Sequence, residues 1–231
     1  MNRPIILALD TKDLDTAKAW IDSTRDSIDI YKIGLEFFLK HGAAGLRELR
    51  EGRDFDLFLD LKLHDIPNTV SGAVESVSEI NPRFLTVHAS GGSKMISAAA
   101  GVKQNISITA VTILTSLSDD EVAEIGYRQD AHASALQLAE MSARSGARSI
   151  VCSPFEVSAI REAVGADLTL ITPGVRPVGA DMGDQSRVMT PPQAIAAGAD
   201  YLVIGRPITG AWSQGRQVMQ SAAQAILESV N

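Results

Sequence analysis

The sequence has very little cysteine and no long hydrophobic run. Cys152 is the only cysteine among 231 residues, so an internal disulfide and a zinc site with two cysteine ligands are both excluded. The first residues, MNRPIILALD, hold five consecutive apolar residues before Asp10, which is too few for a signal-peptide core or a membrane span. We therefore expect a cytoplasmic protein with no membrane partner.

Positive charge is also scarce. The 21 lysine and arginine residues face 28 aspartate and glutamate residues, which gives a formal net charge of −7. Such a chain has no general attraction for nucleic acid or anionic membranes, so an anionic ligand must be held by a few well-placed cations. We expect small-molecule partners and no nucleic acid.

The sequence lacks Pro/Ser-rich linkers, low-complexity tracts and runs of like charge. Its length, with 45% hydrophobic residues, suits one substantial core and is short for two ordinary domains. We therefore predict a single domain over residues 1–231.

What the sequence does contain is eight short β-rich runs separated by stretches with helical spacing, such as Leu14, Ala17 and Ile21. Strands that alternate with helices form a parallel sheet covered by helices. Eight such units in about 250 residues favour a closed (β/α)8 TIM barrel over an open doubly wound sheet. The predicted strands are 5–10, 30–34, 57–63, 84–89, 106–114, 149–153, 168–174 and 201–205.

The third run, LFLDLKL, has leucine at every odd position from 57 to 63. Its even positions carry Phe58, Asp60 and Lys62, and His64 follows in the same alternation. Alternation along a strand predicts that the leucines pack under the helices while Asp60, Lys62 and His64 face the barrel interior. Active sites of such barrels lie at the C-terminal ends of the strands. Other strand ends carry Asp10, Lys32, Asp65, His88 and Thr115, so ionisable groups converge on one mouth.

Two structural alternatives compete with a catalytic interpretation of this face. A buried ion pair that serves only the core is costly to desolvate. A metal site formed by Asp60, His64 and Asp65 would face competition from Lys62 for the same carboxylates. We expect His64 and His88 to be packed, hydrogen-bonded histidines.

Lys62 lies between Asp60 and Asp65, and Lys32 is a second lysine at the same mouth. Nearby carboxylates keep both ammonium groups protonated, so each lysine is an acid and not a nucleophile. A fixed ammonium can stabilise a carbanion and deliver a proton to it. One such ion pair contributes about 4 kcal/mol, which is less than the roughly 8–23 kcal/mol typical of enzymes. Further binding energy must come from elsewhere.

The second half of the sequence offers a phosphate site, because barrels commonly hold phosphate in the loops after strands seven and eight. Arg176 follows the seventh strand, Gln185 lies in a glycine-bearing loop over 178–187, and Gly205 and Arg206 follow the eighth strand. Arginine can chelate phosphate with two N–H groups. A helix cap with a solvated arginine is the alternative for Gly205 and Arg206. We expect the 178–187 loop to close over the phosphate.

These residues resemble the orotidine 5′-monophosphate decarboxylase family, which makes UMP in the last step of de novo pyrimidine synthesis. The resemblance covers essentially the whole chain. The DxKxxD pattern is shared with related magnesium-dependent enzymes, whereas the continuation HDIPNT together with GDQ and GRPI is more specific. The matching motifs are ALD (8–10), YKIG (31–34), DLKLHDIPNT (60–69), TVHASGG (86–92), ILTS (113–116), GVRP (174–177), GDQSRVMTP (183–191) and YLVIGRPIT (201–209).

The resemblance implies that Lys62 is the general acid that protonates C6 of the pyrimidine, with Lys32, Asp60 and Asp65 completing an alternating charged array. It also implies a homodimer with shared active sites. A second subunit would contribute Asp65, Ile66 and Thr69.

The substrate contacts implied by the resemblance divide into three groups, with no metal and no cofactor. Asp10 and Lys32 would contact the ribose, and Thr115 would lie at the pyrimidine. The phosphate side would comprise Arg176, Gln185, Gly205 and Arg206. Two alternatives remain: a magnesium-dependent sugar-phosphate decarboxylase or aldolase of the same superfamily, and a non-catalytic sensor of nucleotide monophosphate.

Overall fold

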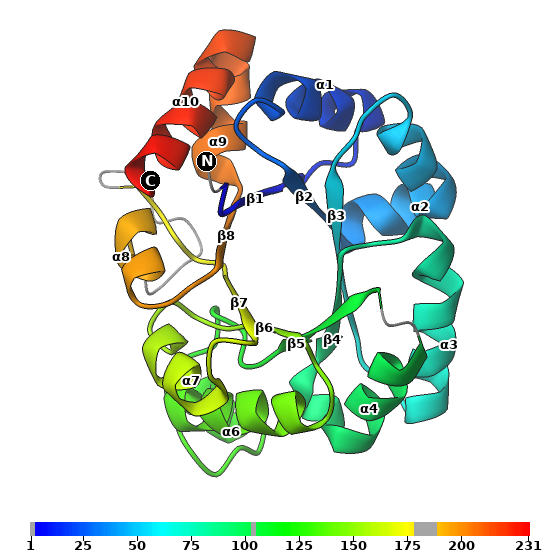
Figure 1. Cartoon of the computed structure of the whole chain (residues 1–231), viewed down its shortest axis with the longest axis vertical. Helices are drawn as coiled ribbons and strands as arrows, with labels where there is room; N and C mark the ends of the chain where they lie inside the picture. Colours follow the sequence, from blue (N-terminus) through cyan, green and yellow to red (C-terminus); the bar gives the residue numbers. More distant parts are fainter. Residues whose placement is uncertain (1–2, 103–104, 178–188) are drawn as a thin grey trace.

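A computed structural model describes residues 3–102, 105–177 and 189–231. Eight parallel strands close into one barrel in sequence order, and the last strand pairs with the first. Figure 1 shows the ring of strands surrounded by helices. The predicted (β/α)8 barrel is therefore confirmed.

The strands and helices alternate along the chain. The strands are β1 (Ile5–Ala8), β2 (Ile30–Gly34), β3 (Asp56–Leu63), β4 (Phe84–His88), β5 (Ser107–Val111), β6 (Ser149–Val151), β7 (Thr169–Thr172) and β8 (Tyr201–Ile204). The helices are α1 (Leu14–Thr24), α2 (Leu35–Arg50), α3 (Pro67–Val77), η1 (Ser78–Ile80), η2 (Ala89–Gly91), α4 (Gly92–Val102), α5 (Asp119–Glu124), α6 (Ala131–Arg144), α7 (Val157–Val164), α8 (Pro191–Ala196), α9 (Arg206–Thr209), η3 (Gly210–Gln214) and α10 (Arg216–Ser229).

Two apolar layers hold the barrel together. The larger layer lies between strands and helices and contains the buried Leu57 and Leu59, as alternation along β3 predicts. The smaller layer fills the barrel interior with Ile6, Ala8, Ile30, Phe58, Phe84, Ile171 and Val203. The barrel is thus a packed core and not a pore, and it leaves space only at its ends.

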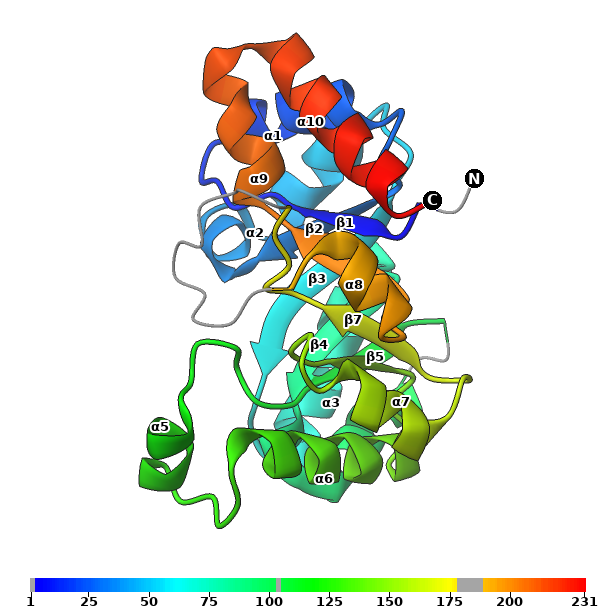
Figure 2. The ribbon, with the colours of Figure 1, turned by 90° about the vertical axis from the view of Figure 1, so that its left-hand side faces the viewer.

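The predicted fifth strand is shorter than its apolar run. Its ladder ends at Val111, and the chain then turns into a long connection that carries the extra helix α5. Figure 2 shows α5 projecting from the body of the barrel. Ile113 and Val122 belong to a separate small apolar cluster that anchors this connection. Among the described residues, no helix is long and apolar enough to cross a membrane.

Candidate active site

A cavity of about 550 Å³ opens at the C-terminal ends of the strands. Its walls come from six strands, β1, β2, β3, β5, β6 and β8, and from the segments that follow β1, β5, β7 and β8. Eight of the residues predicted from the sequence line it: Asp10, Lys32, Asp60, Lys62, Thr115, Arg176, Gly205 and Arg206. The fold therefore gathers most of the predicted site in one place.

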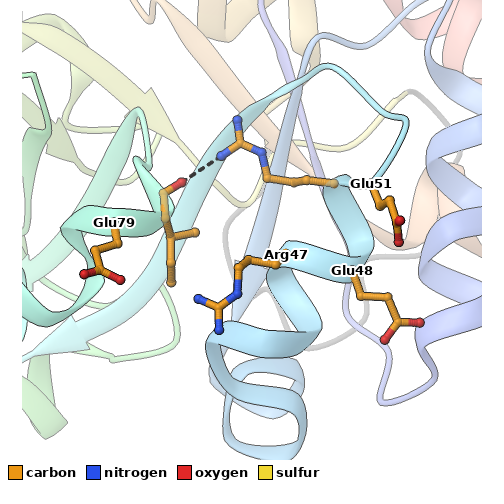
Figure 3. A pocket seen from close by; sticks show the side chains of 6 residues that line it. Arg47, Glu48, Glu51 and Glu79 are labelled. Atoms are coloured by element: carbon orange, nitrogen blue, oxygen red, sulfur yellow. Dashed lines mark hydrogen bonds between the residues drawn. The ribbon is translucent and has the colours of Figure 1, made fainter.

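A second hollow, of about 560 Å³, lies between the C-terminal end of α2 and η1. Figure 3 shows Arg47, Glu48, Glu51 and Glu79 around it. Arg50 also lines it, but its Nη1 donates a hydrogen bond of 2.8 Å to the carbonyl of Ile80. The groups around this hollow are mixed in charge and come from helices, with no residue from the end of a strand. We therefore take the barrel mouth as the candidate active site.

The end of β3 departs from a regular strand just where the charged residues lie. Leu59 pairs with Leu85 and Leu63 pairs with Val87. Between these two pairs β3 advances by four residues and β4 by two, so β3 forms a bulge. Inside this bulge Lys62 adopts a left-handed conformation with φ of 48°. A side chain other than glycine is strained there, and such strain is typical of functional sites. Bulges near active sites re-aim side chains.

Two lysines share one buried carboxylate at the base of the cavity. The Nζ atom of Lys62 lies 2.8 Å from both carboxylate oxygens of Asp60. The Nζ atom of Lys32 lies 3.6 Å from Asp60 Oδ2 and 3.1 Å from Asp10 Oδ1. The side chains of Lys32 and Asp60 are each only 12% exposed, whereas that of Lys62 is 32% exposed. Both lysines line the cavity, and Lys62 is the more exposed of the two.

The electrostatics of this cluster favour its charged form. Burial by itself raises the pKa of Asp60, but the ammonium groups of Lys32 and Lys62 and their hydrogen bonds outweigh it and lower that pKa. Burial likewise lowers the pKa of Lys32, but the carboxylates of Asp10 and Asp60 outweigh it and raise that pKa. Asp60 is thus ionised and Lys32 protonated at neutral pH.

Thr86, in the middle of β4, is a site residue that the sequence interpretation did not single out. It is fully buried; its hydroxyl accepts a hydrogen bond of 2.8 Å from the Lys62 amide and donates one of 3.0 Å to Asp60 Oδ1. The signal was present, because Thr86 shares the inward face of β4 with Phe84 and His88. A threonine between them marks a polar position in the barrel interior.

The prediction that His64 is a packed, hydrogen-bonded histidine that faces the barrel interior was wrong. His64 is exposed, because β3 ends at Leu63 and His64 already lies in the loop. Its ring centroid is 5.5 Å from that of His88, which is half-buried at the end of β4. Burial and the proximity of His64 and Lys62 lower the pKa of His88, which favours the neutral imidazole.

The opposite wall of the cavity carries the residues expected to hold phosphate. Arg176 follows β7 and Arg206 begins α9, directly after Gly205. Arg206 thus starts a one-turn helix, which together with η3 precedes the last helix, α10. Two arginines on one wall give the cavity an anion-binding side. Gln185 and the 178–187 loop lie outside the described residues.

Apolar residues complete the lining of the cavity, and the sequence did not predict which residues these are. The run that was predicted to extend the fifth strand instead supplies cavity-lining residues after the strand has ended. The apolar lining comprises Ala8, Phe58, Val111, Ile113, Leu114, Val151, Pro173 and Val203. Thr115 lies at the end of this segment, also in the lining. The cavity therefore combines a charged base, a cationic wall and an apolar lining that comes from several strands.

Asp65, Ile66 and Thr69 do not join this cavity in their own chain. All three are exposed, and Ile66 is 66% exposed although it is a large apolar residue. The carboxylate of Asp65 accepts a hydrogen bond of 2.6 Å from the Ile66 amide. In the described part of the chain, no ion pair joins Asp65 to either lysine. The stretch from 65 to 69 thus lies beside the cavity and faces outward.

Comparison with known proteins shows which family this chain is similar to. The model of the family "Orotidine 5′-phosphate decarboxylase / HUMPS family" matches residues 3–221. The chain belongs to this family. The resemblance noted in the sequence is therefore confirmed at the level of the family.

Two members named orotidine 5′-phosphate decarboxylase show how close the similarity is. The protein from Thermobifida fusca is 49% identical over 224 residues, which cover 97% of this chain and 96% of that protein. The protein from Shewanella sediminis is 45% identical over 215 residues, or 91% of this chain and 92% of that protein. The chain therefore matches decarboxylases of this family over nearly its full length.

A solved structure of an orotidine 5′-phosphate decarboxylase supports the same assignment. The crystal structure of the enzyme from Lactobacillus acidophilus superposes with a TM-score of 0.85 at 35% identity and covers 99% of both chains. An uncharacterised conserved protein from Geobacillus kaustophilus superposes with a TM-score of 0.82 at 29% identity.

Proposed function

We propose that this chain is a carboxy-lyase that converts orotidine 5′-monophosphate into UMP and CO2. The observation that carries the proposal is Lys62, whose ammonium is held by Asp60 in a cavity that also contains Arg176 and Arg206. Relatives with up to 49% identity are named for this activity. The chemistry of the cavity matches a substrate with a phosphate at one end and a carbon that must be protonated at the other.

Lys62 is the general acid in this proposal. The bond between C6 of the pyrimidine and the carboxylate carbon breaks, CO2 departs, and the electron pair stays on C6. The Lys62 ammonium stabilises this negative charge and transfers a proton to C6, which forms the C–H bond of UMP. Lys62 then regains its proton from solvent. Lys32 remains charged beside Asp10 and Asp60, so it holds the array in place during the reaction.

The phosphate binds at a distance from the reacting carbon. Arg176 and Arg206 on the cationic wall would hold it, together with Gln185 and the Gly205 backbone, while Asp10 and Lys32 contact the ribose and Thr115 lies at the pyrimidine. Binding energy from such a remote group can be used to stabilise the transition state. This contribution adds to the charged base, whose single ion pairs are too weak to supply the whole acceleration.

The active site is completed by a second copy of the chain, which makes the protein a homodimer. Asp65, Ile66 and Thr69 are exposed beside the cavity and do not line it. A smaller hollow of about 240 Å³, lined by Lys32, Lys62 and Leu35 among others, opens next to the charged base and offers room for a carboxylate from outside. Leu35 and Leu39, one turn apart on α2, are 46% and 78% exposed, and neighbouring apolar side chains of this kind are suited to an interface.

The substrate places the reaction at the last step of de novo pyrimidine synthesis, in the cytoplasm. A growth experiment tests this activity in cells. Expression of this chain should allow a pyrimidine-requiring strain that lacks the decarboxylase to grow without uracil. Expression of Lys62→Ala at the same level should not.

The activity itself is tested by following the absorbance of orotidine 5′-monophosphate with purified protein, with and without EDTA. Loss of substrate at the same rate in both samples, with one UMP formed per substrate consumed, is the expected result. Activity that disappears with EDTA and returns with Mg²⁺ would support the magnesium-dependent relatives instead. Binding of the nucleotide without turnover would support a sensor.

A further inference from the structure

Thr86 occupies a special place between β4 and the bulge of β3. It is the residue on β4 that lies between Leu85 and Val87, the two partners of β3 on either side of the bulge. The regular pairing of β3 with β4 is interrupted between Leu59 and Leu63. Within this bulge the Lys62 amide donates a hydrogen bond of 2.8 Å to the Thr86 hydroxyl.

The direction of both hydrogen bonds follows from the chemistry of a hydroxyl. An amide N–H can only donate, so the Thr86 oxygen must be the acceptor from Lys62. An ionised carboxylate can only accept, so the Thr86 proton must point to Asp60 Oδ1, 3.0 Å away. One buried hydroxyl therefore connects the backbone of the lysine to the carboxylate that binds the same lysine's ammonium.

We propose that Thr86 is a positioning residue for the decarboxylation. Its hydroxyl holds the Lys62 backbone in the left-handed conformation and fixes the rotamer of Asp60, so that the Lys62 ammonium points into the cavity. The inference rests on the proposed role of Lys62 as the general acid. Thr86 itself lies outside the cavity lining, so it acts through Lys62 and Asp60 and does not touch the substrate.

Substitution of Thr86 separates the hydroxyl from the rest of the side chain. Thr86→Val keeps the shape but removes both hydrogen bonds, the one from the Lys62 amide and the one to Asp60. Thr86→Ser keeps the hydroxyl and loses only a methyl group. A matched control is Thr109→Val on the neighbouring strand, because Thr109 is also fully buried inside the barrel and its hydroxyl lies 2.6 Å from Ser149 Oγ, away from the cavity.

We expect Thr86→Val to lower kcat by about 10- to 100-fold while KM changes by less than about 3-fold, because the phosphate contacts are untouched and the acid is misplaced. Thr86→Ser should restore kcat to within about 3-fold of wild type. Thr109→Val should lose stability without a comparable loss of kcat.

The pH profile gives a second measurement that a merely structural role would not change. Donation from Thr86 favours the ionised form of Asp60, so its removal should raise the pKa of that carboxylate. The acid limb of kcat/KM should then move to higher pH in Thr86→Val and return in Thr86→Ser. The titration of the substrate phosphate is common to all variants and cancels in this comparison.

Wild-type kcat in Thr86→Val, or a loss that Thr86→Ser does not reverse, would overturn the inference. If Thr86→Val does not fold, Thr86→Ala replaces it; failure of both to fold while Thr109→Val folds would assign the hydroxyl to folding and also overturn it. The proposed function fails separately: in that case Lys62→Ala retains turnover. If Lys62→Ala is inactive and Thr86→Val is fully active, the role of Thr86 is wrong and the role of Lys62 stands.

Discussion

Strands β3 and β4 carry charged clusters at both of their ends, and the two clusters are built differently. At the N-terminal end, Arg83 donates hydrogen bonds of 2.7 Å to Asp56 and to the hydroxyl of Tyr201. Its guanidinium also lies 5.1 Å from the ring centroid of Phe84 and 5.3 Å from that of Tyr201. One cation here has one carboxylate, one hydroxyl and two aromatic faces.

At the C-terminal end, two ammonium groups share the carboxylate of Asp60, and Lys62 has a strained backbone. Here the Lys62 ammonium lines an open cavity, whereas the guanidinium of Arg83 is held by Asp56 and Tyr201, although its side chain is 41% exposed. The same two strands thus carry two differently built clusters. Where they begin, Arg83 links Asp56 of β3 to Tyr201 of β8, and where they end, a lysine lines the cavity.

The largest effect is expected from Lys62→Ala, which should lower kcat by about 100- to 10,000-fold, the range usual for a general acid. The variant should remain folded, because Lys32 still neutralises Asp60. Measurements of turnover, of circular dichroism and of UMP binding would check this. Near-wild-type turnover in a folded Lys62→Ala protein would show that Lys62 is not the general acid.

The next effect concerns the cationic wall of the same cavity. Arg206→Ala should lower kcat/KM for the nucleotide. The loss should correspond to about 2–4 kcal/mol of transition-state stabilisation, as expected when one charged hydrogen-bonding partner is removed. Turnover of phosphate-free orotidine should be nearly unchanged. The two substrates should be compared in the same preparation. Equal losses on both would show that Arg206 is not a phosphate ligand.

A third prediction tests whether the charged base is completed by a second chain. Lys62→Ala and Asp65→Ala, each nearly inactive alone, are mixed in equal amounts, dissociated and allowed to re-form dimers. Half of the dimers are mixed, and one of the two sites in each mixed dimer is intact. Activity should therefore return to about one quarter of the wild-type value at equal total protein.

The design contains its own control, because each variant carried alone through the same dissociation should stay inactive. If Lys62 and Asp65 served one site from one chain, every site would keep a lesion. Mixing would then restore nothing.

The smallest effect is expected at the other end of the barrel. Arg83→Gln should lower the free energy of unfolding by about 1 kcal/mol, since the ion pair is partly exposed and its contribution is screened. Its kcat should stay within about 2-fold of wild type. Urea unfolding and steady-state kinetics would measure both quantities. A loss of kcat without a loss of stability would reverse the roles assigned to the two ends.

The sequence predicted the barrel because strand and helix patterns repeat eight times. It also predicted that most of the candidate residues meet at one mouth, because they lie at strand ends. Periodicity could not reveal the bulge, since the leucines on both sides of it keep the same parity. Without the bulge, the contact between Thr86 and Lys62 could not be anticipated. His64 was misplaced because the alternation was continued one residue past the predicted strand, whose end at residue 63 agrees with the end of β3.

The left-handed conformation of Lys62 has a consequence for how the protein would change under selection. Glycine, and to a lesser degree asparagine or aspartate, tolerates this conformation better than lysine does. Most natural proteins are not at their stability optimum, and sites of strained function are where stabilising substitutions appear. In a library selected for folding alone, position 62 should therefore drift early towards glycine. Lysine should persist at this position only where selection also acts on the activity.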